Sequence, residues 1–145
     1  MTPSEHKPAV RAVHGEASND RFNGRLLYVE DNLQVADITC IMLEDVGLDI
    51  IHAISAEDAL KIADDNDPFD IVLTDVVMPG LSGVQLARRL NQRWPAMPVV
   101  LMSGYSDELA AGYGSQFELL RKPFTRGILL DCLQRHLDGA VYQNA

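Results

Sequence analysis

The segment IVLTDVVMPGLSG, residues 71–83, places one carboxylate, Asp75, directly after an apolar run that is typical of a buried strand. A buried carboxylate is unfavourable unless a cation or hydrogen-bond donors compensate its charge. Other apolar runs in the chain end close to further groups that could share in the same chemistry, namely Glu30, Asp31, Ser103 and Lys122.

The types of these side chains indicate phosphoryl chemistry at a metal site. Three clustered carboxylates, Glu30, Asp31 and Asp75, repel one another unless a cation is present or some are protonated. Hard oxygen ligands suit Mg²⁺, which retains water and is often completed by a phosphate. A phosphoryl group on Asp75 would also meet the ammonium of Lys122 and the hydroxyl of Ser103. An aspartate can itself accept such a group as an acyl phosphate.

Each residue also has an ordinary explanation when it is taken alone. An acid after a strand is usually a helix cap or a solvated loop residue, and Glu30-Asp31 followed by Asn32 is typical of a helix start. Ser103 alone suits a turn, and Lys122 alone suits a solvated surface. The chemical interpretation therefore depends on whether the fold brings these positions together.

Short apolar runs bounded by turn residues predict five strands that are buried on both faces. They are Leu26–Val29, Asp49–Ile54, Asp70–Thr74, Pro98–Ser103 and Phe117–Leu120.

Longer segments between these runs have the apolar spacing of helices. Leu33–Val46 is one such segment, and Gly47 suits the position after its end. Its apolar residues include Val35, Ile38, Ile41 and Met42. Four further helix starts are marked by Ser55, by Ser82 with Gln85 in a capping-box pattern, by Ser106 and by Thr125.

Strict alternation of five strands and five helices predicts an α/β fold, a flavodoxin-like doubly wound parallel sheet of order 2-1-3-4-5 with helices on two faces. Ligands of such sheets bind beyond the carboxyl ends of the strands, at the switch point between the first and third strands. Glu30-Asp31, Asp75, Ser103 and Lys122 all fall at carboxyl ends. The fold class therefore predicts that these groups converge.

The composition argues against several other classes of protein. The chain has 145 residues, 47% of them hydrophobic, and no apolar run approaches a membrane span. The net charge of −9 and the lack of a basic stripe argue against direct nucleic-acid binding. Cys40 and Cys132 fit no metal-ligand or disulfide-rich spacing and are expected to be buried, reduced thiols of a cytoplasmic protein.

The pattern also divides the chain. Residues 1–24 lack periodicity and are rich in polar residues, which predicts a flexible N-terminal tail with solvated His6 and His14. Residues 25–138 are expected to form one domain. Residues 139–145 form a short C-terminal tail, and no output domain is expected.

Four pieces of the chain, LLYVEDN, IVLTDVVMPGLSG, VVLMSGYSDE and LLRKPFT, resemble the receiver domain of two-component response regulators. The segments TDVVMPG and MSGYSDE are most similar to those of bacterial receivers attached to hybrid sensor histidine kinases. The resemblance implies a cytoplasmic signalling phosphoacceptor that takes a phosphoryl group from a histidine kinase or a histidine phosphotransfer protein. It implies no enzymatic activity beyond self-catalysed phosphotransfer and slow autodephosphorylation.

The resemblance assigns a role to each matching position. It makes Asp75 the phosphoacceptor and, with Asp31 and the backbone carbonyl of Val77, a direct Mg²⁺ ligand. It places Glu30 where the family more often has aspartate, so that this side chain acts through metal-bound water. It assigns contacts with the phosphoryl oxygens to Ser103 and Lys122, and it implies a cis peptide before Pro123.

Two positions depart from the family pattern. Leu119 stands where many members carry an aromatic residue that moves during switching, so either Tyr105 couples instead or Tyr105 simply covers the rim of the site, which we favour. Val77 cannot orient water by hydrogen bonding, and Tyr105 would crowd the approach. Slow hydrolysis of phosphorylated Asp75 is therefore predicted.

The sequence leaves several readings of function open. Output is expected through a partner on the face of the fourth helix, fifth strand and fifth helix, or through phosphate relay or storage, and a homodimer is not excluded. The alternative is a pseudo-receiver that works without phosphate. An aspartate-based phosphohydrolase is disfavoured because Val77 stands where its second acid belongs. A flavodoxin is disfavoured because the acidic first turn would repel phosphate.

Overall fold

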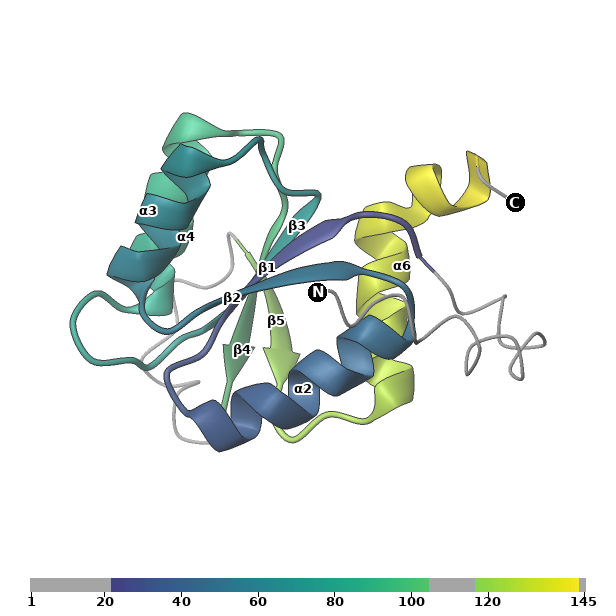
Figure 1. The fold of residues 1–145 in the computed structure, drawn as a ribbon, viewed down its shortest axis with the longest axis horizontal. Coiled ribbons are helices and arrows are strands. Elements are labelled where there is room, and N and C mark those ends of the chain that lie inside the picture. The colour runs from purple at the N-terminus through teal and green to yellow at the C-terminus, as the bar shows by residue number, and fades with distance from the viewer. Residues whose placement is uncertain (1–21, 105–116, 144–145) are drawn as a thin grey trace.

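The computed structural model describes residues 22–104 and 117–143, with side chains as far as Leu137. Its five strands form one parallel sheet in the order β2-β1-β3-β4-β5 (Figure 1), which confirms the predicted topology. The elements are β1 (Arg25–Val29), α2 (Leu33–Asp45), β2 (Asp49–Ala53), α3 (Ala56–Asp65), β3 (Ile71–Asp75), α4 (Gly83–Arg93), β4 (Val99–Ser103), β5 (Glu118–Arg121) and α6 (Arg126–Gln143).

The boundaries differ from the expected ones in a few places. β3 includes Asp75, so the acid is the last residue of the strand and not the residue after it. α6 continues to Gln143, into the segment 139–145 that was expected to be a C-terminal tail. The short helix predicted after Ser106 lies outside the described residues, which contain four of the five expected helices.

The helices cover both faces of the sheet, α3 and α4 on one and α2 and α6 on the other (Figure 1). Successive residues of β1 alternate between the two cores, because side chains of a strand point to opposite faces. Leu27 and Val29 pack with α3 and α4, whereas Leu26 and Tyr28 pack with α2 and α6. All four are almost fully buried, and so are β3 and β4, which explains why these strands are uninterrupted apolar runs. The edge strands β2 and β5 are only partly buried, contrary to the prediction, because each has a neighbouring strand on one side only.

The helix caps predicted from sequence are confirmed. The side chains of Asn32 and Ser55 accept hydrogen bonds from backbone amides at the starts of α2 and α3. Ser82 and Gln85 form the capping box of α4. The hydroxyl of Thr125 accepts from the Ile128 amide at 3.1 Å. These bonds satisfy amides that would otherwise lack partners in the first turns.

Helix α2 presents several of its large apolar side chains to solvent. Ile38 and Ile41 are 65% and 68% exposed, and the side chains packed on the sheet are Ala36, Thr39 and Leu43. Cys40 is therefore only partly buried, contrary to expectation, whereas Cys132 on α6 is fully buried as predicted.

No described helix combines the length and apolar character needed to cross a bilayer.

Gly83, the first residue of α4, sets how closely that helix approaches β3. A Cβ atom at this position would lie 1.8 Å from the carbonyl oxygen of Asp75. The Gly83 amide donates to the carbonyl of Val76 at 2.8 Å. The glycine is therefore required by contact with the backbone of the acid-bearing strand, and not by an unusual φ angle.

Replacing Gly83 by alanine is expected to destabilise the protein by at least about 2 kcal/mol, because the β3–α4 connection must move away from Asp75. Gly127 offers a matched control in the first turn of α6, where a Cβ atom would meet nothing nearer than Thr125 Oγ1 at 3.8 Å. Alanine at that position is expected to stabilise by about 0.5–1 kcal/mol. Urea unfolding of both variants measures the contrast, and equal effects would contradict it.

Candidate functional site

The predicted site residues meet at the carboxyl edge of the sheet. Asp75 ends β3 and Ser103 ends β4, while Glu30 directly follows β1 and Lys122 directly follows β5. Because the strands are parallel and β1, β3, β4 and β5 are consecutive neighbours, these positions share one edge. Asp31 follows Glu30 and is exposed.

A lysine lies between two buried acids at the centre of this edge. The Lys122 ammonium is 2.6 Å from Asp75 Oδ1 and 3.4 Å from Glu30 Oε1. Glu30 and Asp75 are only 2% and 6% exposed. Carboxylate oxygens of Glu30, Asp31 and Asp75 lie within 4.8 Å of one another. The predicted convergence of the acids and the lysine is therefore found in the structure.

The burial of Asp75 makes its negative charge unfavourable. Burial raises the pKa of Asp75 from 3.8 to about 7, although the hydrogen bond and charge of Lys122 oppose the shift, and the nearby Glu30 adds to it. Burial alone would lower the pKa of Lys122, but its contacts with Asp75 raise it. One ammonium thus compensates the acids only in part, as expected for a site that can receive a further cation.

Ser103 contributes a buried hydroxyl with unused hydrogen-bonding capacity. Its side chain is 1% exposed, and Oγ has no hydrogen-bond partner among the described residues. Buried polar atoms without partners are rare and generally have an explanation in function or in a missing ligand. A group with oxygen acceptors attached to Asp75 would supply such a partner, since Ser103 and Asp75 end neighbouring strands.

Two residues outside the predicted set hold Glu30 in place. His52 Nε2 donates to the backbone carbonyl of Glu30 at 2.8 Å, and the Asn32 amide donates to Glu30 Oε2 at 3.1 Å. His52 lies on β2, opposite Tyr28 of β1. Its support of Glu30 could not be found from residue type, and strand register is the only signal that places it near.

The remaining predicted positions are distributed around the site. Val77 is 59% exposed two residues beyond Asp75, and Leu119 on β5 is 40% exposed. The Lys122–Pro123 peptide is cis, as the family resemblance implied. Tyr105 lies outside the described residues.

The donor set fits a hard divalent cation. It consists of three carboxylates, and carboxylates with retained water are what Mg²⁺ favours. The exposed Asp31 leaves an open side, whereas Lys122 occupies the side facing β5.

A doubly wound parallel sheet with an acidic group, a lysine and a free hydroxyl at its switch point defines the class of aspartate phosphoacceptors. The family model of the response regulator receiver domain matches residues 26–134. The chain belongs to this family, the receivers of two-component signal transduction.

Individual relatives agree with this assignment. The chain is 32% identical over 125 residues to the sensor protein TorS of Escherichia coli K12, covering 83% of this chain and 14% of that protein. It is 33% identical over 120 residues to the response regulator FleR of Pseudomonas aeruginosa, covering 81% of this chain and 25% of that protein. The chain therefore spans a minor part of these curated relatives.

Solved structures agree as well. A response regulator receiver domain from Clostridium thermocellum aligns with a TM-score of 0.68 at 30% identity, covering 83% of this chain and 95% of that chain. A sensor protein from Polaromonas aligns with a TM-score of 0.70 at 29% identity, covering 80% and 97% of the two chains.

The raised pKa of Asp75 has a consequence for stability in metal-free buffer. A group whose pKa is higher in the folded than in the unfolded state stabilises the fold below its unfolded pKa. That stabilisation is lost as the pH rises through the folded pKa, here from about 4 to about 7. Asp75→Asn lacks this titration and should gain stability relative to wild type over that range, by on the order of 2 kcal/mol.

Urea unfolding of both proteins in chelator at pH 5 and pH 8 measures the difference. The parent at each pH is the control for general charge effects. A stability difference between the two proteins that does not change with pH would contradict the electrostatic account of Asp75.

Proposed function

We propose that this receiver accepts a phosphoryl group on Asp75 with Mg²⁺ held by Glu30, Asp31 and Asp75, from a phosphohistidine donor. The observation that carries the proposal is the contact of Lys122 with Asp75 at 2.6 Å beside two further carboxylates. An ammonium at that distance compensates the negative charge of the acid. It can then compensate the charge of a phosphoryl group attached to that acid. The unpartnered Ser103 hydroxyl supports the same role.

The proposed reaction divides among the side chains as follows. A carboxylate oxygen of Asp75 forms a bond to phosphorus, while the phosphorus–nitrogen bond of the donor breaks and its electron pair returns to the imidazole. Lys122 stabilises the charge on the phosphoryl oxygens, and Ser103 donates a hydrogen bond to one of them. Mg²⁺, when bound, neutralises charge on the phosphoryl oxygens and on the acids.

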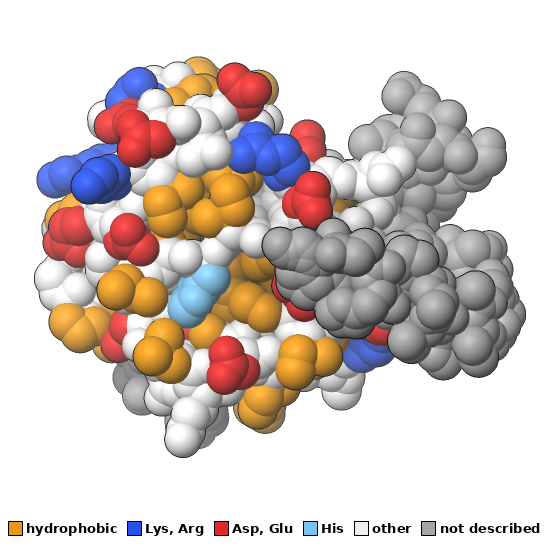
Figure 2. Space-filling view, viewed as in Figure 1, with side chains coloured by type: hydrophobic (Ala, Val, Ile, Leu, Met, Phe, Trp, Pro, Cys, Tyr) orange, Lys and Arg blue, Asp and Glu red, His pale blue; other side chains and the backbone are white. Residues whose placement is uncertain are grey.

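The surface around the site suits a protein donor. A donor must bring its phosphohistidine to Asp75, so its surface covers the carboxyl edge of the sheet. Leu33, Ile54 and Val77 are exposed by 61%, 55% and 59% in the segments that follow β1, β2 and β3. Figure 2 shows hydrophobic side chains gathered on the face where Figure 1 places α2 and β2. We infer that a histidine kinase or histidine phosphotransfer protein docks on this apolar rim.

Output is proposed to run through a partner that binds the face formed by β5, α6 and the helix predicted after Ser106, or through relay of the phosphate. The chain is proposed to act in the cytoplasm, where kinases supply phosphohistidine. The domain is proposed to comprise residues 25–138 as predicted, extended by Phe22, which packs in the core, and by the last turns of α6 to Gln143.

The test of the proposed function uses intact mass. Incubation with Mg²⁺ and a small-molecule acyl phosphate donor is expected to add one phosphate to the wild-type chain. Asp75→Asn should remain unmodified, and Lys122→Ala should be modified far more slowly while binding Mg²⁺ at least as tightly, because it loses a competing cation.

The other readings predict different outcomes. Absence of any adduct, with the chain folded, would favour the interaction module that works without phosphate. Rapid release of inorganic phosphate without an adduct would favour a hydrolase. An adduct that persists in Asp75→Asn would place the acceptor elsewhere.

Hydrolysis of the phosphorylated chain is predicted to be slow, because the apolar Val77 cannot orient an attacking water. Val77→Asn is expected to raise the rate of dephosphorylation several-fold, since an amide can hydrogen-bond water beside the acyl phosphate. The decay of the adduct, followed by intact mass after removal of the donor, measures this rate.

Ile128→Asn is a matched control, because Ile128 is similarly exposed but lies on α6. If polar replacements at Val77 and Tyr105 leave the rate of decay unchanged, these two side chains do not determine the lifetime of the phosphorylated form.

A further inference from the structure

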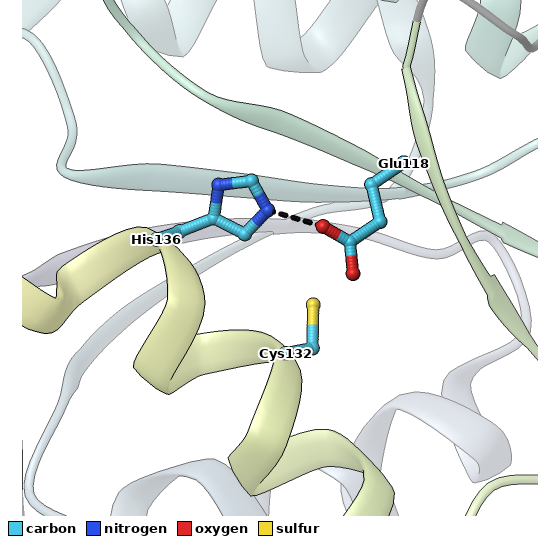
Figure 3. Close-up of side chains that lie close together, drawn as sticks. All are labelled: Glu118, Cys132 and His136. Atoms are coloured by element: carbon cyan, nitrogen blue, oxygen red, sulfur yellow. Dashed lines mark hydrogen bonds and ion pairs between the residues drawn. The ribbon is translucent and has the colours of Figure 1, made fainter.

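A second group of metal-ligand side chains lies at the other end of β5 from the acidic site. Glu118 is the first residue of β5, whereas Lys122 follows its last residue. Cys132 and His136 lie one helical turn apart on α6 and point toward Glu118 from the same face (Figure 3). One ligand atom from each of the three side chains lies within 4.8 Å of the others.

The immediate contacts describe a compact polar group against the core. His136 Nε2 lies 2.6 Å from Glu118 Oε1, and Arg135 forms an ion pair with Glu118 Oε2. The Cys132 side chain is fully buried, while Glu118 and His136 are partly exposed. Although burial raises the pKa of Glu118, the hydrogen bonds from Arg135 and His136 lower it overall. Glu118 is therefore held as a carboxylate with Oε1 turned toward the histidine (Figure 3).

We propose that Glu118, Cys132 and His136 form a binding site for a borderline-soft divalent transition metal, with Zn²⁺ the best match. Thiolate, imidazole and carboxylate are the three ligand types that Zn²⁺ takes in proteins. Zinc–ligand bonds of about 2.0–2.3 Å in a tetrahedron place ligand atoms about 3.3–3.7 Å apart. His136 Nε2 and Glu118 Oε1 are 2.6 Å apart and must separate to reach that spacing, and one ligand atom from each of the three side chains already lies within 4.8 Å of the others.

The surroundings supply the other requirements of such a site. Arg135 remains on Oε2 and orients the carboxylate while Oε1 binds the metal, as outer hydrogen bonds do at metal sites. An open groove of about 570 Å³ is lined by Glu118 and His136 and gives an entry path and room for a water as fourth ligand. The site lies away from Asp75, so hard Mg²⁺ and softer Zn²⁺ would occupy different positions.

Binding of Zn²⁺ releases the thiol proton of Cys132. The Cys132 S–H bond breaks, the sulfur–zinc bond forms, and the proton passes to solvent. Burial raises the pKa of Cys132 to about 12, so the thiol is protonated before the metal enters. In the free chain His136 Nε2 donates its proton to Glu118 Oε1. For the metal to bind, the neutral imidazole must change tautomer: the Nε2 proton leaves to solvent, Nδ1 takes one up, and the lone pair of Nε2 is then available to the metal. One positive charge enters net, beside the carboxylate of Glu118.

The sequence pattern alone did not reveal this site. Cys132 and His136 are four residues apart along α6, but the third ligand comes from β5, and the two cysteines of the chain are not spaced as a pair. Only the packing of α6 on the sheet brings Glu118 to them.

The test titrates Co²⁺, as a spectroscopic substitute for Zn²⁺, into the full reduced chain with excess Mg²⁺ present to fill the acidic site. A thiolate-to-cobalt charge-transfer band in the near ultraviolet and strong visible bands of tetrahedral cobalt are expected, and Zn²⁺ should bleach both. Cys132→Ser should abolish the charge-transfer band. His136→Gln and Glu118→Gln should each weaken Co²⁺ binding at least tenfold and leave that band at saturation, since the thiolate remains.

Matched controls separate this site from other donors. Cys40→Ser removes the other thiol, and His6→Gln with His14→Gln removes two histidines near the N-terminus; both variants should bind as the parent does. Circular dichroism checks that each variant is folded. Absence of the charge-transfer band in the folded parent, or a band that survives Cys132→Ser, overturns the proposal and leaves the group a hydrogen-bonded link between β5 and α6.

Discussion

The ion pair of Lys122 with Asp75 is the interaction on which the arrangement of the site depends. Asp75 is buried at the end of a central strand with Glu30 beside it, so two acids share a small, poorly solvated space. Without a cation one of them would have to be protonated at neutral pH. Lys122 forms ion pairs with both Asp75 and Glu30, but it leaves the exposed side at Asp31 open. The protein therefore keeps a buried carboxylate whose charge is compensated only in part.

The parallel sheet fixes the positions of these side chains. The central strands β1, β3 and β4 are buried on both faces. Their side chains alternate between two cores, so none of these strands can slip by one residue without exchanging the cores. Fixed register then fixes where each strand ends. Gly83 adds a second constraint, because the start of α4 rests against the carbonyl of Asp75 with no room for a Cβ atom. The position of Asp75 is thus set by packing on several sides.

Residue patterns were sufficient to predict the strand order, the helix caps and the convergence of Glu30, Asp31, Asp75, Ser103 and Lys122, because all of these follow from local periodicity and from parallel topology. The predicted pattern for α2 did not show which side chains face the sheet. Its core face is Ala36, Thr39 and Leu43, and the larger Ile38 and Ile41 are exposed. Hydrophobicity alone cannot distinguish a core face from an apolar surface that is kept for a partner.

Contacts between elements that are distant in sequence were also beyond local patterns. His52 supports Glu30 through the β1–β2 pairing, and the requirement for glycine at position 83 arises from a contact with β3. The Glu118, Cys132 and His136 group belongs to the same kind of feature, since it exists only where α6 packs on β5.

β5 connects the acidic site with the Glu118, Cys132 and His136 group. Its end leads into Lys122 at the acidic edge, and its start carries Glu118 at the opposite edge. The strand has few residues and pairs only with β4 in the described sheet, so it is less restrained than the central strands. Under the proposed function, Lys122 would exchange a carboxylate for a phosphoryl group, and a change in its position would be passed along this short edge strand toward α6. A metal joining Glu118 to α6 would restrain that movement, because it would fix the start of the strand to the helix that covers it.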